Sequence, residues 1–381
     1  MSNYQTPGVY VEEVSTGAKP IGMVGTSTAA FLGAAPRAGA HVGKPRPCHN
    51  WSQFVADYAE ADSTSNDLAV AVQGFFLNGG GRCFIVNTGT EADLAGGLEA
   101  LEAFDEIAIV CAPGQGDAAA YEAVLIHCEK LGDRVAILDF PADAEDLEAL
   151  KKVASASGGG SGFRPRSSED GYGAVYFPHL IVRDPFDPSR TLDAAPSGHI
   201  AGIYARTDAK RGVHKPPANE TVRGALGLKK LVSRAEQGEL NKAGVNVIRF
   251  FPTSGIRVWG ARTLADEASE WRYINVRRLV NMIKESIEEG TRWTVFEPND
   301  MTLWKSVERN VRAFLTLLWR QGALLGETPE QAFFVRCDDE TNTPESIDAG
   351  RLITEIGIAP VKPAEFIVFR LGMIRPDEDQ G

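Results

Sequence analysis

The hydrophobic pattern near the C-terminus predicts a β-strand that is covered on both faces. The segment KPAEFIVFRLGM (residues 362–373) carries apolar groups on both alternating sets of positions: Phe366, Val368 and Arg370 on one side, and Ile367, Phe369 and Leu371 on the other. An unpaired apolar strand edge recruits other chains, so a soluble protein rarely leaves such a segment free. We therefore expect this strand to pair with another strand.

The first half of the chain alternates predicted strands and helices, which is typical of an α/β fold with a doubly wound sheet. Asn66 can cap a helix that carries Leu68, Val72 and Phe75/Phe76 on one face, and the glycines at 79 and 80 end it. A second helix is predicted at residues 118–131, and strands are predicted at residues 28–34, 83–86, 106–111, 134–140 and 174–182.

The second half begins with two amphipathic helices and ends with short strands. Residues 276–289 place Leu279, Val280, Ile283 and Ile287 on one side and Arg277, Lys284 and Glu288 elsewhere, with Gly290 as a stop. A longer helix follows a cap at Asn299 or Asp300, and its apolar positions recur at helical spacing: Trp304, Val307, Val311, Phe314 and Leu318. Strands are predicted at residues 333–338, 352–358 and 365–371.

Two strand ends carry acids and glycines where a doubly wound sheet binds ligands: residues 112–117 (APGQGD) and 139–143 (DFPAD). The same residue types are favoured in ordinary turns between a strand and a helix. No phosphate-loop or dinucleotide motif follows the first predicted strand, and no nucleophile and base form a recognisable set. We expect turns and no cofactor, and an enzyme with a nucleotide site at residues 112–117 remains the alternative.

The formal net charge of −12 argues against a nucleic-acid binder, whose affinity would come from Lys and Arg on phosphates. The five cysteines form no Cys-x-x-Cys pair, so we expect buried thiols and no metal site. We see no secretory leader, and no apolar run approaches the ~18 residues of a membrane span. We expect a protein made in a cytoplasm, without membrane insertion.

One basic run stands out in this acidic chain. Within residues 196–220 it comprises Arg206, Lys210, Arg211 and Lys215. Such a run is usually a solvated face, but it is also suited to bind the acidic surface of another copy.

Seven segments, in the expected order from end to end, resemble the contractile tail sheath proteins of bacteriophage tails, R-type pyocins and extracellular contractile injection systems. They are TPGVYVEEV (6–14), FFLNGGGRCFIV (75–86), PSGHIAGIYARTDAKRGVHKPPAN (196–219), RVWGARTL (257–264), RYINVRRL (272–279), WRQGALLG (319–326) and IGIAPVKPAEFIVFRL (356–371). The resemblance covers essentially the whole chain.

The resemblance implies a mixed α/β sheath fold with four parts. These are an N-terminal exchange arm and linker (1–22), an inserted outer α/β domain (23–250), an inner, tube-facing core domain (251–360), and a C-terminal exchange strand and tail (361–381). It implies that both arms add strands to neighbouring copies, through Val9, Tyr10, Val11, Phe366, Ile367, Val368, Phe369 and Leu371. The arm hinges are expected at Gly17, Pro20, Pro360 and Pro363.

The resemblance also implies how the subunits work together. Six copies per ring are expected to stack into a tube around an inner tube protein, bounded by baseplate and cap or terminator proteins, and to contract without nucleotide. We expect inner-tube contact at Arg320, Gln321, Glu327 and Glu330, and contacts of the contracted state at the basic run. Because the chain has both arms, a phage tail or an injection particle is favoured over a type VI secretion sheath. A baseplate protein of the same fold is a further alternative.

Overall fold

The computed structural model describes residues 20–60, 62–90, 93–155 and 162–367. The chain divides into two compact units: a larger unit of residues 24–285 and 360–381, and a smaller unit of residues 1–23 and 286–359. The chain passes between the units at three places: between residues 23 and 24, inside helix α7 (Ile274–Thr291) and at Pro360. The sequence placed a boundary at residues 250/251. The assignment of outer and inner domains to an assembled particle stays a prediction.

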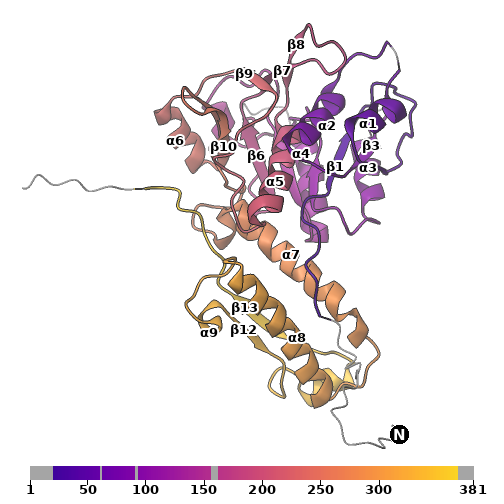
Figure 1. The fold of residues 1–381 in the computed structure, drawn as a ribbon, viewed down its shortest axis with the longest axis vertical. Coiled ribbons are helices and arrows are strands. Elements are labelled where there is room, and N and C mark those ends of the chain that lie inside the picture. Colours follow the sequence, from indigo (N-terminus) through magenta and orange to yellow (C-terminus); the bar gives the residue numbers. More distant parts are fainter. Residues whose placement is uncertain (1–19, 61, 91–92, 156–161, 368–381) are drawn as a thin grey trace, which may run out of the picture. The chain divides into compact units, whose positions relative to one another are not determined.

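An eight-stranded sheet forms the centre of the larger unit (Figure 1), in the order β11-β10-β6-β5-β4-β1-β3-β2. The six central strands are parallel, and the two edge strands β2 and β11 run antiparallel to their neighbours. The strand bounds are β1 (Ala29–Gly33), β2 (Arg46–Cys48), β3 (Cys83–Asn87), β4 (Ile109–Cys111), β5 (Val135–Asp139), β6 (Gly173–Phe177), β10 (Val245–Phe251) and β11 (Gly255–Val258).

Helices cover both faces of this sheet because alternate residues of each buried strand point to opposite sides. Phe31 of β1 belongs to one buried cluster with residues of α1 (Trp51–Tyr58), α2 (Asp67–Asn78) and α5 (Ser197–Arg211). Its neighbour Leu32 belongs to a second cluster with residues of α3 (Leu94–Leu101), α4 (Ala118–Leu131) and α6 (Arg234–Lys242). The predicted doubly wound arrangement is confirmed.

The predicted helix ends in this unit are also confirmed. The Asn66 side chain accepts a hydrogen bond from the Ala69 amide at the start of α2. Gly79 ends the helix with φ 109°, a left-handed conformation that glycine adopts at little cost. The bounds of α4 coincide with the predicted range of 118–131. The larger unit also contains two short 3₁₀ helices, η1 (Ala149–Lys151) and η2 (Glu270–Arg272).

The prediction of a single strand at residues 174–182 is wrong, because this segment forms two strands. Pro178 lacks a backbone N–H and interrupts it, so that β6 ends at Phe177 and β7 (Leu180–Arg183) begins in another sheet. That sheet has three antiparallel strands in the order β8-β7-β9, with β8 (Thr191–Ala194) and β9 (Ala225–Leu228). Leu180 and Val182 pack it onto the first buried cluster.

Helix α7 differs from its predicted pattern. It extends one residue beyond Gly290, and Arg277, which the pattern placed away from the apolar side, is only 3% exposed. The Arg277 guanidinium lies 4.0 Å from the Trp271 ring centroid and 4.6 Å from that of Tyr172. Aromatic faces thus bury this cation, which a hydrophobic pattern does not anticipate.

The smaller unit packs one long helix against a two-stranded antiparallel sheet. Helix α8 (Met301–Arg320) is capped by Asp300, which accepts a hydrogen bond from the Leu303 amide, and its predicted apolar stripe is buried. The remaining elements are η3 (Arg292–Thr294), α9 (Pro329–Ala332), β12 (Phe333–Arg336), α10 (Pro344–Asp348) and β13 (Glu355–Ile358).

The C-terminal strand of the sequence analysis is not formed in the part that the structure describes. Residues 361–367 of this single chain carry no strand assignment, and residues 368–381 lie outside the described part. The predicted N-terminal strand at residues 9–11 lies outside it as well. No described helix is long and apolar enough to cross a membrane.

Candidate assembly surfaces

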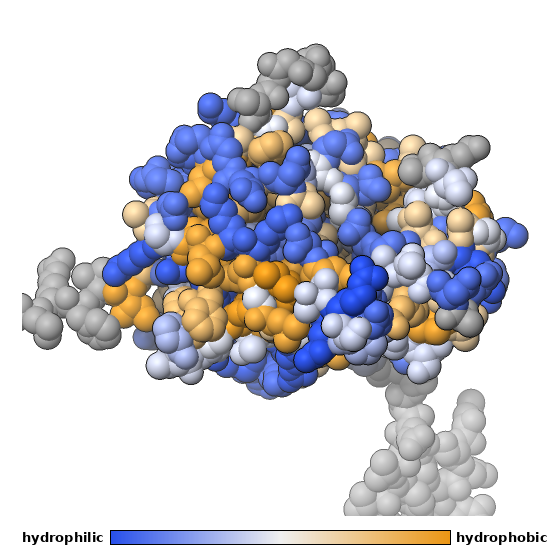
Figure 2. Space-filling view, turned by 90° about the horizontal axis from the view of Figure 1, so that it is seen from above, coloured by the Kyte–Doolittle hydropathy of each residue, from blue (hydrophilic) through white to orange (hydrophobic). Residues whose placement is uncertain are grey.

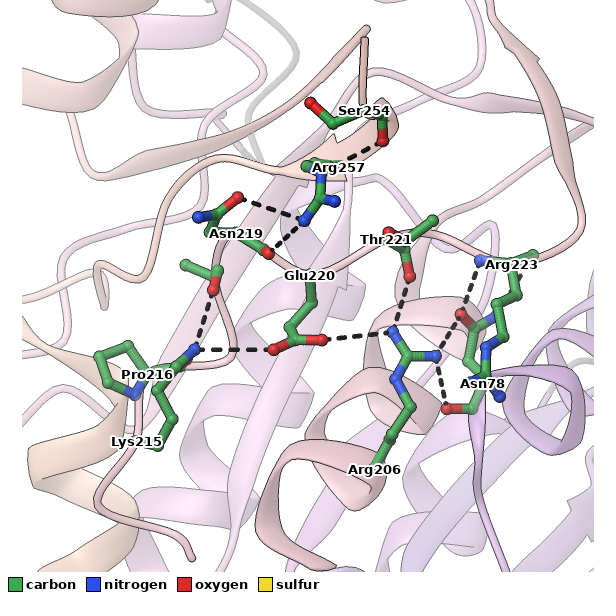
Figure 3. A network of polar contacts seen from close by, with 11 residues as sticks. Asn78, Arg206, Lys215, Pro216, Asn219, Glu220, Thr221, Arg223, Ser254 and Arg257 are labelled. Carbon is green, nitrogen blue, oxygen red and sulfur yellow. Dashed lines mark hydrogen bonds and ion pairs between the residues drawn. The ribbon is translucent and has the colours of Figure 1, made fainter. Parts of the chain in front are cut away.

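The basic run of the sequence does not form one exposed stripe. Arg206 of α5 is only 6% exposed, and its guanidinium donates hydrogen bonds to the Asn78 carbonyl at 2.9 Å and the Thr221 carbonyl at 2.6 Å (Figure 3). Glu220 lies 3.8 Å from the same guanidinium and also 3.8 Å from the Lys215 ammonium. We therefore correct the expectation for Arg206, which ties α5 to the end of α2 and to the segment beside β11.

Lys215 is also largely used within its own chain. Its ammonium donates to the carbonyls of Pro216 at 2.6 Å and Ala218 at 3.0 Å (Figure 3), and burial lowers its pKa. Lys210 and Arg211, in the last turn of α5, are exposed. Of the four predicted residues, these two are therefore the ones available to another copy.

The strand ends that suggested a ligand site are filled by the protein's own groups. Asp139, at the end of β5, is 1% exposed and accepts hydrogen bonds from the Ser197 amide at 2.8 Å and the Ser197 hydroxyl at 2.5 Å. A side chain at Gly116 would meet the Pro141 nitrogen at 2.5 Å. Burial raises the pKa of Asp139 to about 6, and the Ser197 donors oppose that rise. The geometry supports turns that hold the N-terminus of α5.

The eight-stranded sheet and the two-stranded sheet differ in how their edge strands are covered. In the eight-stranded sheet, Pro47 interrupts the donors of edge strand β2, and the backbone at residues 219–222 bonds to β11 on the other edge. In the smaller unit, the backbones of β12 and β13 bond each other, and within the described chain neither forms a backbone bond on its outer side. Phe334 of β12 is 53% exposed. This small sheet is therefore open to additional strands.

The four residues expected at the inner tube are all exposed. Arg320 ends α8, Gln321 follows it, and Glu327 and Glu330 flank the start of α9. The exposed side of α8 adds three further cations, Lys305, Arg309 and Arg312, whose only acidic neighbour on the helix is Glu308. This side of the helix is therefore basic in a chain that is acidic as a whole.

The expected arm residues fall partly within the described chain. Phe366 and Ile367 are each 74% exposed, while Val9, Tyr10, Val11, Val368, Phe369 and Leu371 lie outside the described residues. Among the hinges, Gly17 lies outside; Pro20, Pro360 and Pro363 lie inside. Exposed apolar side chains also occur on the larger unit at Leu226, Leu231 and Phe250, and Figure 2 shows apolar residues gathered in a band between polar ones.

Two models of known protein families match this chain and identify the kind of protein to which these surfaces belong. The family model described as the phage tail sheath protein central domain matches residues 87–264, and the one described as the phage tail sheath C-terminal domain matches residues 266–374. The chain belongs to the phage tail sheath family.

Solved sheath structures resemble the chain over nearly its whole length. A sheath complex of the extracellular contractile injection system PVC, in its contracted state, is 31% identical with a TM-score of 0.80, covering 98% of this chain and 99% of that chain. The anti-feeding prophage baseplate structure is 30% identical with a TM-score of 0.77, covering 98% and 100%. The sheath fold of this chain is therefore established.

Curated sheath relatives are longer than this chain. The putative prophage major tail sheath protein of Pseudomonas aeruginosa strain UCBPP-PA14 is 29% identical over 182 residues, which are 47% of this chain and 45% of the relative. The chain spans less than half the length of the curated relatives it matches. Sheath proteins are structural, which agrees with the expectation of a structural subunit rather than an enzyme.

Sequence reasoning missed the buried role of Arg206, although a signal was present. Residues 197–207 of α5 are buried without interruption, and the small residues of SGHIAG fit a helix that is enclosed on all sides. A charged residue four positions after Gly202 lies on that enclosed helix. Arg206 lies within the enclosed part of α5, whereas Lys210 and Arg211 lie in its last turn, so the position along the helix gave a reason to separate them.

Proposed function

We propose that this chain is the repeating subunit of a contractile sheath and that copies are joined by strand exchange. The observation that carries the proposal is the open two-stranded sheet β12–β13 in a chain that also contains an apolar segment at residues 366–371. A two-stranded sheet is marginal by itself and gains stability from further strands. The large sheet has both edges blocked, and the two-stranded sheet β12–β13 is the acceptor that we propose.

The donor strands of this proposal are the two arms. Phe366 and Ile367 expose apolar side chains in the single chain, which is unfavourable unless a partner covers them. Residues 366–371 of one copy would pair with the β12–β13 sheet of a neighbour, and Val9, Tyr10 and Val11 of another copy would add on the other side. Each subunit then donates strands and receives strands.

Such contacts propagate. A donor surface that differs from its acceptor surface gives head-to-tail contacts, which produce open helical assemblies when they do not close. Rings of six copies stacked around an inner tube are the arrangement we propose, with baseplate and terminator proteins at the ends. The particle is a phage tail or a contractile injection particle, and the subunit is made in a bacterial cytoplasm.

The inner tube is the proposed partner of the smaller unit. The exposed basic side of α8, together with Arg320, Gln321, Glu327 and Glu330, offers a charged surface to a tube of complementary charge. Contraction would release these contacts and bring Lys210 and Arg211 against acidic surfaces of other copies. The extended state is metastable in this proposal, and packing in the contracted state supplies the energy.

The experiment is to express the full chain and a version ending at Glu365, and to examine both by negative-stain electron microscopy. Striated hollow tubes of the full chain that the shortened chain does not form support the proposal. A baseplate role, which the similarity to a baseplate structure keeps as the second candidate, predicts closed rings without propagation. Discrete small particles from both versions contradict strand exchange.

A further inference from the structure

Glu365, directly before the exchange segment, is held by four hydrogen bonds from its own subunit. Its carboxylate accepts hydrogen bonds from the Arg262 guanidinium at 3.0 and 2.9 Å, from the Asn241 side-chain amide at 2.6 Å and from the Tyr273 hydroxyl at 3.1 Å. Its side chain is 20% exposed, although the residues on either side of it are exposed. A two-pronged guanidinium–carboxylate pair is among the stronger and more directional polar contacts.

Arg262, the main partner of Glu365, is itself held by buried hydrogen bonds of the larger unit. The side chain of Asn246 in β10 is fully buried; it accepts a hydrogen bond from the Arg262 amide at 2.7 Å and donates one to the Arg262 carbonyl at 2.7 Å. The Arg262 guanidinium donates to the Asn241 carbonyl at 3.1 Å and is 5% exposed. A cation this deeply buried needs a carboxylate, and Glu365 supplies it, since Glu267 is 3.6 Å away and 60% exposed.

The linker before Glu365 is tied to the same unit. The Asn275 side chain donates a hydrogen bond to the Val361 carbonyl at 3.2 Å. Residues 360–367 group with the larger unit by their contacts, although residue 359 belongs to the smaller one. Both predicted hinges, Pro360 and Pro363, therefore lie upstream of a fixed point.

We propose that Glu365 anchors the root of the C-terminal arm to its own subunit, so that the exchanged segment begins at Phe366 rather than at Pro360 or Pro363. This inference rests on the proposed strand exchange. The anchor sets where the arm leaves the larger unit, and a rotation of that unit carries the arm root with it. Pro360 then lies at one of the places where the chain passes between the two units, and it is not the hinge of the arm.

The test follows the mobility of the linker and the formation of tubes in the full chain. A spin label is placed on Lys362→Cys, an exposed position; the five native cysteines are buried and do not compete for the reagent. The labelled chain is compared with Glu365→Gln, which keeps the side-chain shape and removes its charge. Tyr273→Phe removes a single hydrogen bond, and Glu267→Gln is the matched control because it also lies beside Arg262.

If Glu365 anchors the arm, the spectrum of the spin label changes from mainly slow to mainly fast motion in Glu365→Gln. The spectrum changes partly in Tyr273→Phe and does not change in Glu267→Gln. Fewer and shorter tubes are also expected for Glu365→Gln. If the label spectrum stays slow in Glu365→Gln, Glu365 does not anchor the arm. A fast spectrum together with tubes of normal number and length would also contradict the proposal. If the parent chain forms no tubes, the proposed function fails, and the label spectra still decide the anchor.

Discussion

The Arg278 guanidinium of α7 lies 2.5 Å from the Asp208 carboxylate of α5, and their side chains are 3% and 8% exposed. Arg278 also lies 4.6 Å from the Tyr204 ring centroid and donates a hydrogen bond to the Thr26 carbonyl at 2.9 Å. A buried ion pair thus joins helices α5 and α7 inside the larger unit. Some charged side chains of this chain are therefore buried and stabilise its interior.

Asp208→Asn is expected to destabilise the larger unit by about 3 kcal/mol, because removing one partner leaves the other charge buried and uncompensated. The measurement is the free energy of unfolding of the unassembled chain from urea titration followed by circular dichroism. Glu340→Gln is the control, since its pair with Arg336 is exposed and is expected to contribute less than about 1 kcal/mol. Equal losses in the two variants would contradict the buried-pair account.

The close approach of α2 and α5 depends on glycine. A Cβ at Gly202 would lie 2.4 Å from the Phe75 carbonyl oxygen and 2.7 Å from the Asn78 Cβ, whereas a Cβ at Gly238 in α6 would meet nothing within 4 Å. Gly202→Ala is therefore expected to cost about 2 kcal/mol through overpacking against a backbone that cannot yield. Gly238→Ala is expected to stabilise by about 0.5–1 kcal/mol, because alanine has the higher helix propensity. Thermal unfolding of both variants checks the opposite signs.

The raised pKa of Asp139 predicts that the stability of the folded chain depends on pH. Its folded pKa, about 6, is raised above the ordinary 3.8, so its contribution to stability is fully present below pH 3.8 and is lost as the pH rises through 6. The loss between pH 4.5 and 7.5 is about 2 kcal/mol on the scale of 1.36 kcal/mol per pKa unit. Asp139→Asn cannot ionise, so its destabilisation relative to the parent chain should be smaller at pH 7.5 than at pH 4.5. A difference of the opposite sign would contradict the raised pKa.

Lys210 and Arg211 test the proposed contacts of the contracted state. Changing both to Glu is expected to make contracted tubes dissociate more readily, because the exposed cations would become anions against acidic surfaces. Lys242→Glu, at a 68% exposed side chain of α6, is the control for the added negative charge. The measurement is the fraction of tubes surviving a titration with denaturant. If tubes of the double variant survive as well as those of the parent chain, these two residues do not contribute to the interface.

Much of the larger unit followed from local patterns. Asn66 and Gly79 bound α2 as their capping properties predict, and strands buried on both faces read directly as a doubly wound sheet. Those features are local, since they depend on residues a few positions apart. The break at Pro178 was also local, and its consequence was a change of sheet that only the tertiary structure reveals.

The surfaces were harder to predict because they depend on which charges find buried partners. Arg206, Arg277 and Arg278 are basic residues like Lys210 and Arg211, yet these three are buried through contacts with residues far away in sequence. Glu365 gave no signal in the sequence, since its partners Asn241, Arg262 and Tyr273 come from three separate places in the chain. The exchange strands themselves stay a prediction.

The most direct test is a cryo-electron microscopy reconstruction of tubes formed by the full chain, at a resolution that traces the backbone of residues 366–371. These residues are expected to run as a strand alongside the β12–β13 sheet of a neighbouring copy, while Glu365 stays bound to Arg262 of its own subunit. Residues 366–371 paired within their own subunit, or tubes held together without them, would contradict this expectation.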